Sequence, residues 1–221
     1  MKRFLAVLLV ATMVFGAFAI DISVGGDLDY MHYWNTRKAA ADGKWSKNID
    51  SVNYIGINVF GDFQYAIVSI GGNFSVGGLT NKSKDSDGNK ESESDSKVSV
   101  NNFNLRVLGK YPFGVGIAKL YPMAGFQFSF NTAVKYDGKD MKQYMDSKSK
   151  ADLNKHFFLV GFGADIFVTD HFFIRTTPVF GVAMNKPHDY KENKDQASKF
   201  NVKYTDNSFM FNVSIGAGYK F

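Results

Sequence analysis

The side chains that could perform catalysis or bind a metal are few and widely spaced in this sequence. None of the short spacings that let two imidazoles share a metal ion occurs among the four histidines, which are His32, His156, His171 and His188. There is no cysteine, which excludes thiol catalysis, disulfides and cysteine-based metal sites. The segment "DSDGN" at 85–89 resembles a calcium loop, but its glycine stands at position four instead of six. With no serine-hydrolase or phosphate-loop motif either, the sequence predicts a protein that is not an enzyme and uses no metal or other cofactor.

Charged residues of both signs recur instead at alternate positions within otherwise apolar segments. Asp165, for example, lies between Ala164 and Ile166. Alternation with a period of two is typical of a β-strand that has one apolar and one polar face. The charges are therefore expected on the polar faces of strands. The residues concerned are Asp27, Asp29, Arg106, Lys110, Asp165 and Arg175.

Eight segments of the chain show this alternation. They span residues 20–34, 51–60, 65–76, 98–111, 119–130, 155–168, 172–184 and 209–221. Short connections, such as Gly61-Asp62 and Thr169-Asp170, join the second segment to the third, the fourth to the fifth and the sixth to the seventh. The other four connections are long and polar, at residues 35–50, 77–97, 131–154 and 185–207. This alternation of short and long connections follows if the strands cross a membrane and place all long loops on one side.

A β-structure that crosses lipid must close on itself, because lipid offers no partner for unpaired backbone groups. Such barrels have an even number of strands, apolar outer faces, short periplasmic turns and long external loops. The sequence thus predicts an all-β fold, an eight-stranded antiparallel up-and-down transmembrane β-barrel with four long external loops. Aromatic residues near the strand ends, such as Trp34 and Tyr111, suit the membrane interfaces. The alternative is a soluble, exported, lipocalin-like binding barrel with its apolar faces inward.

The N-terminal residues have the pattern of a secretory signal peptide. Lys2 and Arg3 precede an apolar run over 4–15, and the small residues Ala17 and Ala19 follow it in an A-x-A arrangement. This pattern predicts cleavage after Ala19. The domain organisation expected is therefore a signal peptide at 1–19 and a barrel domain at 20–221.

Lysines and acidic residues are interleaved along most of the chain. The sequence has 26 basic and 21 acidic residues, for a formal net charge of +5, and no basic stretch is left uncompensated. Nucleic acid is therefore not expected as a partner. Residues 77–97 are of low complexity and almost free of apolar side chains, so disorder is expected at the tip of that loop.

Two stretches resemble a known family. The closing "GAGYKF" (216–221), preceded by apolar residues at alternate positions, resembles the C-terminal signature of bacterial outer-membrane barrels. The segment 161–182, "GFGADIFVTDHFFIRTTPVFGV", is similar to a hairpin of the small barrels, a family that includes the OmpA transmembrane domain, OmpX, OmpW and the opacity-type adhesins. The resemblance implies the outer membrane of a diderm bacterium, with loops at the cell surface. It also implies that the barrel-assembly machinery recognises the last strand. The residues that carry this assembly signal are Phe221, Tyr219, Ala217 and Ile215.

In such a barrel the apolar faces point to lipid and the six charged residues named above point inward. The lumen of an eight-stranded barrel is only wide enough for side chains to fill it. An unpaired charge there would be costly, so the six residues are predicted to form a structural charge network. A narrow gated pore, in which Arg106 and Arg175 exchange partners, is one alternative. A second alternative is an OmpW-like passage for small hydrophobic solutes, past Leu108, Met123, Leu159 and Val179.

The long loops contain large aromatic residues that could contact a partner. These are Trp45, Tyr136 and Tyr144. Residues 131–154 are expected to form a short turn or helix above the barrel. Together these features favour a structural or surface-interaction, adhesin-like role for a monomeric protein. Its expected partners are outer-membrane lipid and a host or surface ligand bound through the loops.

Overall fold

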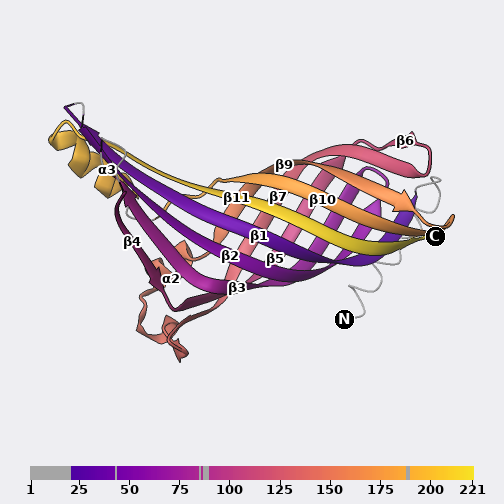
Figure 1. The fold of residues 1–221 in the computed structure, drawn as a ribbon, viewed down its shortest axis with the longest axis horizontal. Coiled ribbons are helices and arrows are strands. Elements are labelled where there is room, and N and C mark those ends of the chain that lie inside the picture. Colours follow the sequence, from indigo (N-terminus) through magenta and orange to yellow (C-terminus); the bar gives the residue numbers. More distant parts are fainter. Residues whose placement is uncertain (1–20, 43, 85, 87–89, 188–189) are drawn as a thin grey trace, which may run out of the picture.

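The computed structural model describes residues 21–42, 44–84, 86, 90–187 and 190–221. The predicted signal peptide and its cleavage residues, Ala17 and Ala19, lie outside these ranges. Eight long strands dominate the described chain and run antiparallel to their neighbours (Figure 1). They are β1 (Ile22–Ala41), β2 (Lys44–Phe63), β3 (Ala66–Lys84), β5 (Val98–Lys110), β7 (Ala118–Tyr136), β9 (Lys155–Phe167), β10 (Phe172–Ala183) and β11 (Lys203–Lys220).

These eight strands form a closed ring. Each strand pairs with the next one in sequence order. The first strand, β1, also pairs with the last, β11, from Ser23 opposite Lys220 to Ala40 opposite Lys203. Closure leaves none of the eight strands with an unpaired edge along the barrel, which satisfies the backbone groups as a lipid environment demands. The predicted fold class, an eight-stranded antiparallel up-and-down barrel, is confirmed.

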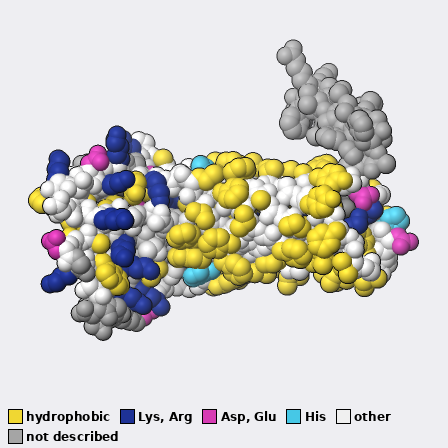
Figure 2. Space-filling view, turned by 90° about the horizontal axis from the view of Figure 1, so that it is seen from above, with side chains coloured by type: hydrophobic (Ala, Val, Ile, Leu, Met, Phe, Trp, Pro, Cys, Tyr) yellow, Lys and Arg dark blue, Asp and Glu magenta, His cyan; other side chains and the backbone are white. Residues whose placement is uncertain are grey.

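The apolar faces of the strands point away from the barrel. Leu28, Ile57 and Ile215 are exposed, whereas the inward-facing neighbours Asp29, Asn58 and Ser214 are buried. Hydrophobic side chains cover the middle of the barrel as a broad band, and Lys and Arg side chains gather at one end (Figure 2). The band is far larger than the apolar patches that soluble proteins expose to water. The arrangement is the opposite of the inward apolar faces that a soluble ligand-binding barrel requires.

The two ends of the barrel differ in their connections (Figure 1). At the end that carries Phe221, the chain turns through short connections such as Gln64-Tyr65. One of these connections contains a short additional strand, β6 (Phe113–Val115), which pairs with β7. At the opposite end lie the long hairpins and the helices. In outer-membrane barrels the short turns are periplasmic and the long connections external, and we name the two ends the periplasmic end and the extracellular end accordingly.

Two of the four long polar connections consist largely of strands that the sequence analysis did not predict. Strands β1 and β2 continue as a paired hairpin as far as Ala41 and Lys44, so most of 35–50 is strand. Within 77–97, where disorder was expected at the tip, β3 pairs with an additional strand, β4 (Lys90–Ser96). Residues 85 and 87–89 of that tip lie outside the described ranges. The strand signal was missed because no face of these hairpins is buried in lipid, and so the apolar period of two is absent.

Strand β3 changes partner where it leaves the band. It pairs with β5 up to Phe74, opposite Asn101, and with β4 from Leu79, opposite Ser96. Between these two ladders lie Gly77 and Gly78, with φ angles of +82° and +80°. Only glycine adopts this backbone conformation without strain, so the glycine pair allows the strand to change register here.

Helices occur only at the extracellular end in the described part of the chain. The connection 137–154 contains β8 (Lys139–Asp140), a 3-10 turn (η1, Lys142–Tyr144) and helix α2 (Ser147–Asp152), as expected for a short turn or helix above the barrel. The Asp146 side chain caps α2 by accepting a hydrogen bond from the Ser149 N–H at 2.7 Å. Helix α3 (Tyr190–Lys199), which was not predicted, packs near β11. No helix within the described residues is long and apolar enough to span a membrane.

Candidate functional site

The periplasmic half of the lumen is built around Arg175. Its side chain, on β10, is only 2% exposed. The guanidinium donates two hydrogen bonds to the facing carboxylate of Asp165 on β9, from Nε to Oδ1 at 2.6 Å and from Nη2 to Oδ2 at 2.7 Å. The same Nη2 also contacts Oδ2 of Asp62 on β2, across the barrel. Bidentate pairing of this kind is the strongest geometry available to an arginine and a carboxylate.

The same layer is completed by other polar and aromatic groups. Lys110 on β5 places its Nζ 2.5 Å from Oδ2 of Asp62, and the hydroxyl of Tyr121 donates to Asp165 Oδ1 at 2.9 Å. The ring of Phe60 lies against the guanidinium, with 4.4 Å between Cζ of Arg175 and the ring centroid. We name Asp62, Lys110, Tyr121, Asp165 and Arg175 the ion layer. It closes the lumen across strands β2, β5, β7, β9 and β10.

A second group of polar residues lies above the ion layer. Asp29 on β1 receives hydrogen bonds to Oδ2 from Nδ2 of Asn58 at 3.1 Å and from Nδ2 of Asn212 at 3.0 Å. Nη2 of Arg106 lies 3.6 Å from the same oxygen, and its Nε donates to Oε1 of Gln127 at 3.0 Å. All of these side chains are buried. Two amides and one arginine therefore compensate the Oδ2 atom of Asp29.

The six charged residues proposed for the lumen all lie inside the barrel, but in two groups. Arg175, Asp165 and Lys110 belong to the ion layer. Asp29 and Arg106 belong to the group above it, to which Asp27 is linked by a hydrogen bond from Nδ2 of Asn58 to its Oδ1 at 2.7 Å. The sequence analysis missed Asp62, because it placed a turn there. The missed signal was the continuation of the even-numbered inward series of β2, after Asn58 and Phe60, to residue 62.

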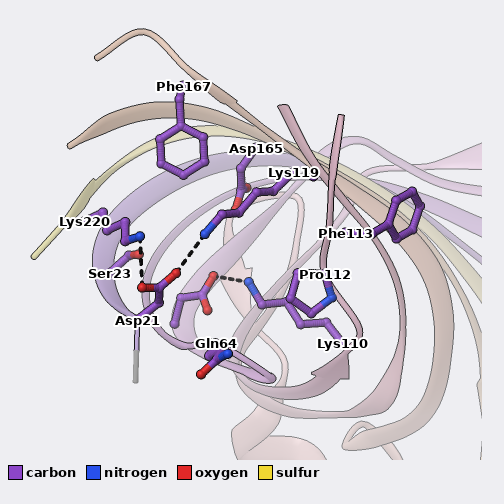
Figure 3. Close-up of a pocket in the computed structure, with 12 residues that line it drawn as sticks. Asp21, Ser23, Gln64, Lys110, Pro112, Phe113, Lys119, Asp165, Phe167 and Lys220 are labelled. Atoms are coloured by element: carbon purple, nitrogen blue, oxygen red, sulfur yellow. Dashed lines mark hydrogen bonds and ion pairs between the residues drawn. The ribbon is translucent and has the colours of Figure 1, made fainter. Parts of the chain in front are cut away.

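A polar pocket of about 210 Å³ opens at the periplasmic end, below the ion layer (Figure 3). Asp21, just before β1, forms ion pairs with Nζ of Lys119 at 2.8 Å and with Nζ of Lys220 at 2.9 Å. The hydrogen bond from Lys119 is the main cause that lowers the pKa of the Asp21 carboxyl from its ordinary value. These pairs join the first strand to β7 and to β11 at the mouth of the barrel. Opposite charges therefore compensate one another at the mouth.

The apolar residues of the passage alternative fill the space between the strands. Leu108, Met123, Leu159 and Val179 are all buried within the hydrophobic cluster of the lumen. The packing around Leu159 is tight, because a Cβ on the facing Gly181 would lie 2.7 Å from Leu159 Cδ2 and 2.6 Å from Met210 Cγ. Protein interiors packed in this way leave no continuous path for a solute.

The four proposed residues of the assembly signal lie on the outer face of the last strand. Ile215, Ala217, Tyr219 and Phe221 are all exposed. The Phe221 N–H donates to the carbonyl of Ile22 at 3.0 Å, so the last residue continues the ladder with β1. Its ring meets that of Tyr219 edge to face, and Tyr219 stacks on His171. These contacts form an aromatic cluster at the periplasmic edge.

The proposed loop residues lie at the extracellular end and apart from one another. Trp45 packs beneath the Nζ of Lys38, 5.1 Å from the ring centroid. Tyr136 and Tyr144 are exposed, the latter to 76%. An exposed aromatic that sequence analysis did not single out is Phe200, directly after α3, which is 79% exposed.

The described histidines contact aromatic side chains on the barrel surface. His32 stacks on Trp34 at 5.3 Å between centroids, and His156 lies 5.3 Å from Phe128. His171 belongs to the aromatic cluster at the periplasmic edge, and His188 lies outside the described residues. Each described histidine thus occupies a different place on the barrel wall.

A closed ring of eight strands, an outer apolar band and a filled polar lumen define an integral β-barrel protein of the bacterial outer membrane. No protein-family model matches the sequence, and neither does any curated protein. Among solved structures, the chain is matched by small outer-membrane barrels at low sequence identity. Neisserial surface protein A has 12% identity and a TM-score of 0.40, with 88% of this chain and 97% of that chain covered.

Two further barrels show a comparable similarity. The N-terminal β-barrel domain of OprF from Pseudomonas aeruginosa has 12% identity and a TM-score of 0.38, and the match covers 86% of this chain and 97% of that domain. Ail, the attachment invasion locus protein of Yersinia pestis, has 14% identity and a TM-score of 0.36, with 89% and 99% covered.

Proposed function

We propose that this protein is a non-conducting outer-membrane barrel whose extracellular hairpins carry a structural or surface-interaction, adhesin-like role. The observation that supports this most directly is the ion layer, in which Arg175, Asp165 and Asp62 close the lumen with almost no exposure. A solute that crossed the barrel would have to separate these buried charges, each at a cost of several kcal/mol. The side chains in the lumen therefore close the barrel. Contacts with other molecules are made at the ends of the barrel.

The extracellular hairpins have the length and order that a binding surface needs. Strand β1 continues for seven residues beyond Trp34, which at ~3.3 Å per residue is about 23 Å along the strand. Cross-strand pairs hold the hairpins, such as Arg37 with Asp50 at 2.6 Å and Lys82 with Glu93 at 3.0 Å. A surface that is ordered before binding loses less conformational entropy when a partner docks.

The hairpins and helices also present side chains suited to recognition. Lys and Arg side chains gather at this end of the molecule (Figure 2), and the aromatic rings of Tyr144 and Phe200 are among the most exposed on the protein. Aromatic and cationic groups of this kind form the contacts that dominate many interfaces. A host or bacterial-surface ligand is the partner that fits this surface.

Two measurements test the surface role. Replacing residues 80–95 by a short turn removes the outer part of the β3–β4 hairpin but leaves the membrane-embedded strands intact. We expect the variant to keep the heat-modifiable gel shift of a folded barrel and to lose binding to cells or host matrix. Planar-bilayer recordings of the refolded wild-type protein are expected to show no conductance. Discrete conductance steps, or full adhesion by the shortened variant, would contradict the proposal.

Passage of small apolar solutes is the second candidate function. The observation in its favour is the cavity in the extracellular half of the lumen, where apolar side chains such as Met31 and Val52 form most of the wall. Such a passage needs the ion layer to open. Uptake of an apolar dye into vesicles that hold the wild-type barrel would support it, and uptake no faster than in empty vesicles would exclude it.

The proposal includes the route by which the protein reaches the outer membrane. Residues 1–19 act as a cleaved signal peptide, and Phe221 acts with the outward residues of β11 as the signal for the barrel-assembly machinery. Deleting Phe221 removes one backbone hydrogen bond to Ile22 and an edge-to-face ring contact with Tyr219 at the exposed rim. We therefore expect membrane insertion in cells to fall several-fold while stability of the refolded barrel changes by about 1 kcal/mol or less. Pulse-chase assembly assays and denaturant titrations measure the two effects, and equal losses in both would contradict the assignment.

A further inference from the structure

The extracellular half of the lumen contains a cavity of about 260 Å³. Residues from six strands of the ring line its wall. Those that define its shape are Met31, Val52, Leu79, Val100, Val134 and Phe157. Val52 pairs with Tyr33, directly beside the pair formed by Trp34 and Ser51. The cavity therefore lies inside the barrel at the level of the aromatic residues near the outer membrane interface.

The floor of the cavity is closed. Met31 is buried, and Nδ2 of Asn73 lies 3.8 Å from its Sδ atom. Beside it, Nε2 of Gln127 donates to Oγ of Ser129 at 3.0 Å. Arg106, bonded to Gln127, and then the ion layer follow below. A molecule could thus enter the cavity only from the side opposite this floor, and it would have no route onward through the lumen.

The mouth of the cavity faces the extracellular end. Leu153, directly after helix α2, belongs to the lining, and so do the charged residues Asp152 and Lys155. Charged groups are thus placed at the mouth, and the deeper wall is mostly apolar, with the polar residues Asn102 and Ser129 also in the lining. This distribution is typical of a small-molecule site, where an apolar wall supplies affinity and a few polar groups lie at the entrance.

The size and lining of this space indicate what it holds. Protein interiors are close-packed and rarely contain voids larger than a water molecule. An apolar cavity of about 150 Å³ in another protein stays dry and binds benzene, because water finds too few hydrogen-bond partners there. We propose that the cavity binds a small uncharged apolar molecule, about the size of one or two fused rings. The site goes beyond the surface role proposed above and does not depend on it.

The probe for the test is naphthalene, added to the wild-type barrel in lipid nanodiscs with 13C-labelled methionine methyl groups. Aromatic rings shift nearby methyl resonances, so the Met31 signal reports occupancy of the cavity directly. Met184, which is exposed, serves as the internal control for naphthalene dissolved in the lipid. We expect a saturable shift of Met31 and a weak, linear one of Met184. Linear shifts of both, or no shift of Met31, would overturn the proposal.

A matched pair of variants on β2 ties the signal to the cavity. Val52→Phe fills the space from its wall, whereas Val59→Phe makes the same change on the exposed outer face of the same strand. Affinity for naphthalene should fall about tenfold or more in Val52→Phe, because the added ring occupies the site, and stay unchanged in Val59→Phe. An affinity for naphthalene in Val52→Phe equal to that of the wild type would overturn the proposal. If Val52→Phe lacks the gel shift of a folded barrel, Val134→Phe on β7 fills the cavity from another wall.

The proposed surface role and the proposed ligand site in the cavity are tested by independent measurements. Replacement of residues 80–95 is scored by adhesion, and the cavity is scored by the Met31 resonance of the intact protein. A barrel that neither adheres nor conducts would still bind naphthalene if the cavity is a site.

Discussion

The two halves of the lumen have the same strands around them but different fillings. In the periplasmic half, long side chains of opposite charge reach across the axis and meet, as Arg175 and Lys110 do at Asp62. In the extracellular half, valines such as Val52, Val100 and Val134 point inward, and a cavity remains between them. The two fillings differ because of side-chain length. A valine side chain ends one carbon beyond its Cβ atom, whereas an arginine side chain extends across much of the barrel. The periplasmic half of the lumen is thus closed by side chains, and the extracellular half retains space for a small molecule.

The halves should also respond differently to a change of volume or charge. A buried ion pair is costly to break by removing one partner, because the other charge is left without compensation. An apolar wall around a cavity tolerates additional volume until the space is full.

The largest effect is expected from Arg175→Met. The variant leaves the carboxylates of Asp165 and Asp62 without their arginine inside the barrel, so the free energy of unfolding should fall by about 3–5 kcal/mol. Denaturant titration of the refolded barrel in detergent measures this loss. The control is Arg37→Met, which breaks a partly exposed pair with Asp50 at the extracellular end and should cost about 1 kcal/mol or less. Similar losses in both variants would show that the ion layer does not hold the fold.

An intermediate effect is expected from added volume. Leu159→Phe places a larger side chain in the tightly packed region against Gly181 and Met210, and should lower the free energy of unfolding by about 1–3 kcal/mol. Val52→Phe, which projects into the cavity, should cost clearly less than Leu159→Phe, because the ring has room there. The same denaturant titrations compare the two. An equal or greater cost for Val52→Phe would mean that the two halves are packed alike.

The smallest effect concerns the periplasmic mouth. Because the pKa of Asp21 is lowered in the folded barrel, its carboxylate stabilises the fold above its ordinary pKa of 3.8, and this contribution is lost as the pH falls through the folded value. The residue is partly exposed, so Asp21→Asn should cost about 1 kcal/mol or less at pH 7. The difference between wild type and variant should vanish at a pH below the lowered pKa. A difference that persists there would mean that the ion pairs with Lys119 and Lys220 are not its source.

Much of the architecture could be predicted because lipid imposes a strict pattern on strands. Each strand that crosses the apolar band alternates apolar and polar residues, so eight strands and their inward faces could be read directly, including Arg106 and Arg175. Asp62 was assigned to a turn, because the pair Gly61-Asp62 has the composition of a turn when only local residues are considered. Its role depends on Arg175, which lies far away in sequence on β10.

Outside the membrane this strict pattern is lost. The hairpin of β1 and β2 and the strand β4 have water on their surfaces, so selection of apolar residues at every second position does not operate there. Their lysine- and serine-rich sequences resemble loops, and local composition also gave no sign of helix α3. Backbone pairing within each hairpin, begun by the strands below it, is what keeps these segments extended.

The amino-acid sequence by itself determined that this chain forms a membrane barrel of eight strands, because a solvent without hydrogen-bond partners permits few alternatives. It also determined most of the charged side chains that enter the lumen, although not Asp62. Only the tertiary structure decided how those side chains combine, with Asp62 and Arg175 joined across the axis and the valines of strands β2, β5 and β7 left apart around a cavity. Pairing across a lumen depends on the register and tilt of all eight strands together, and no single segment of the sequence carries that information.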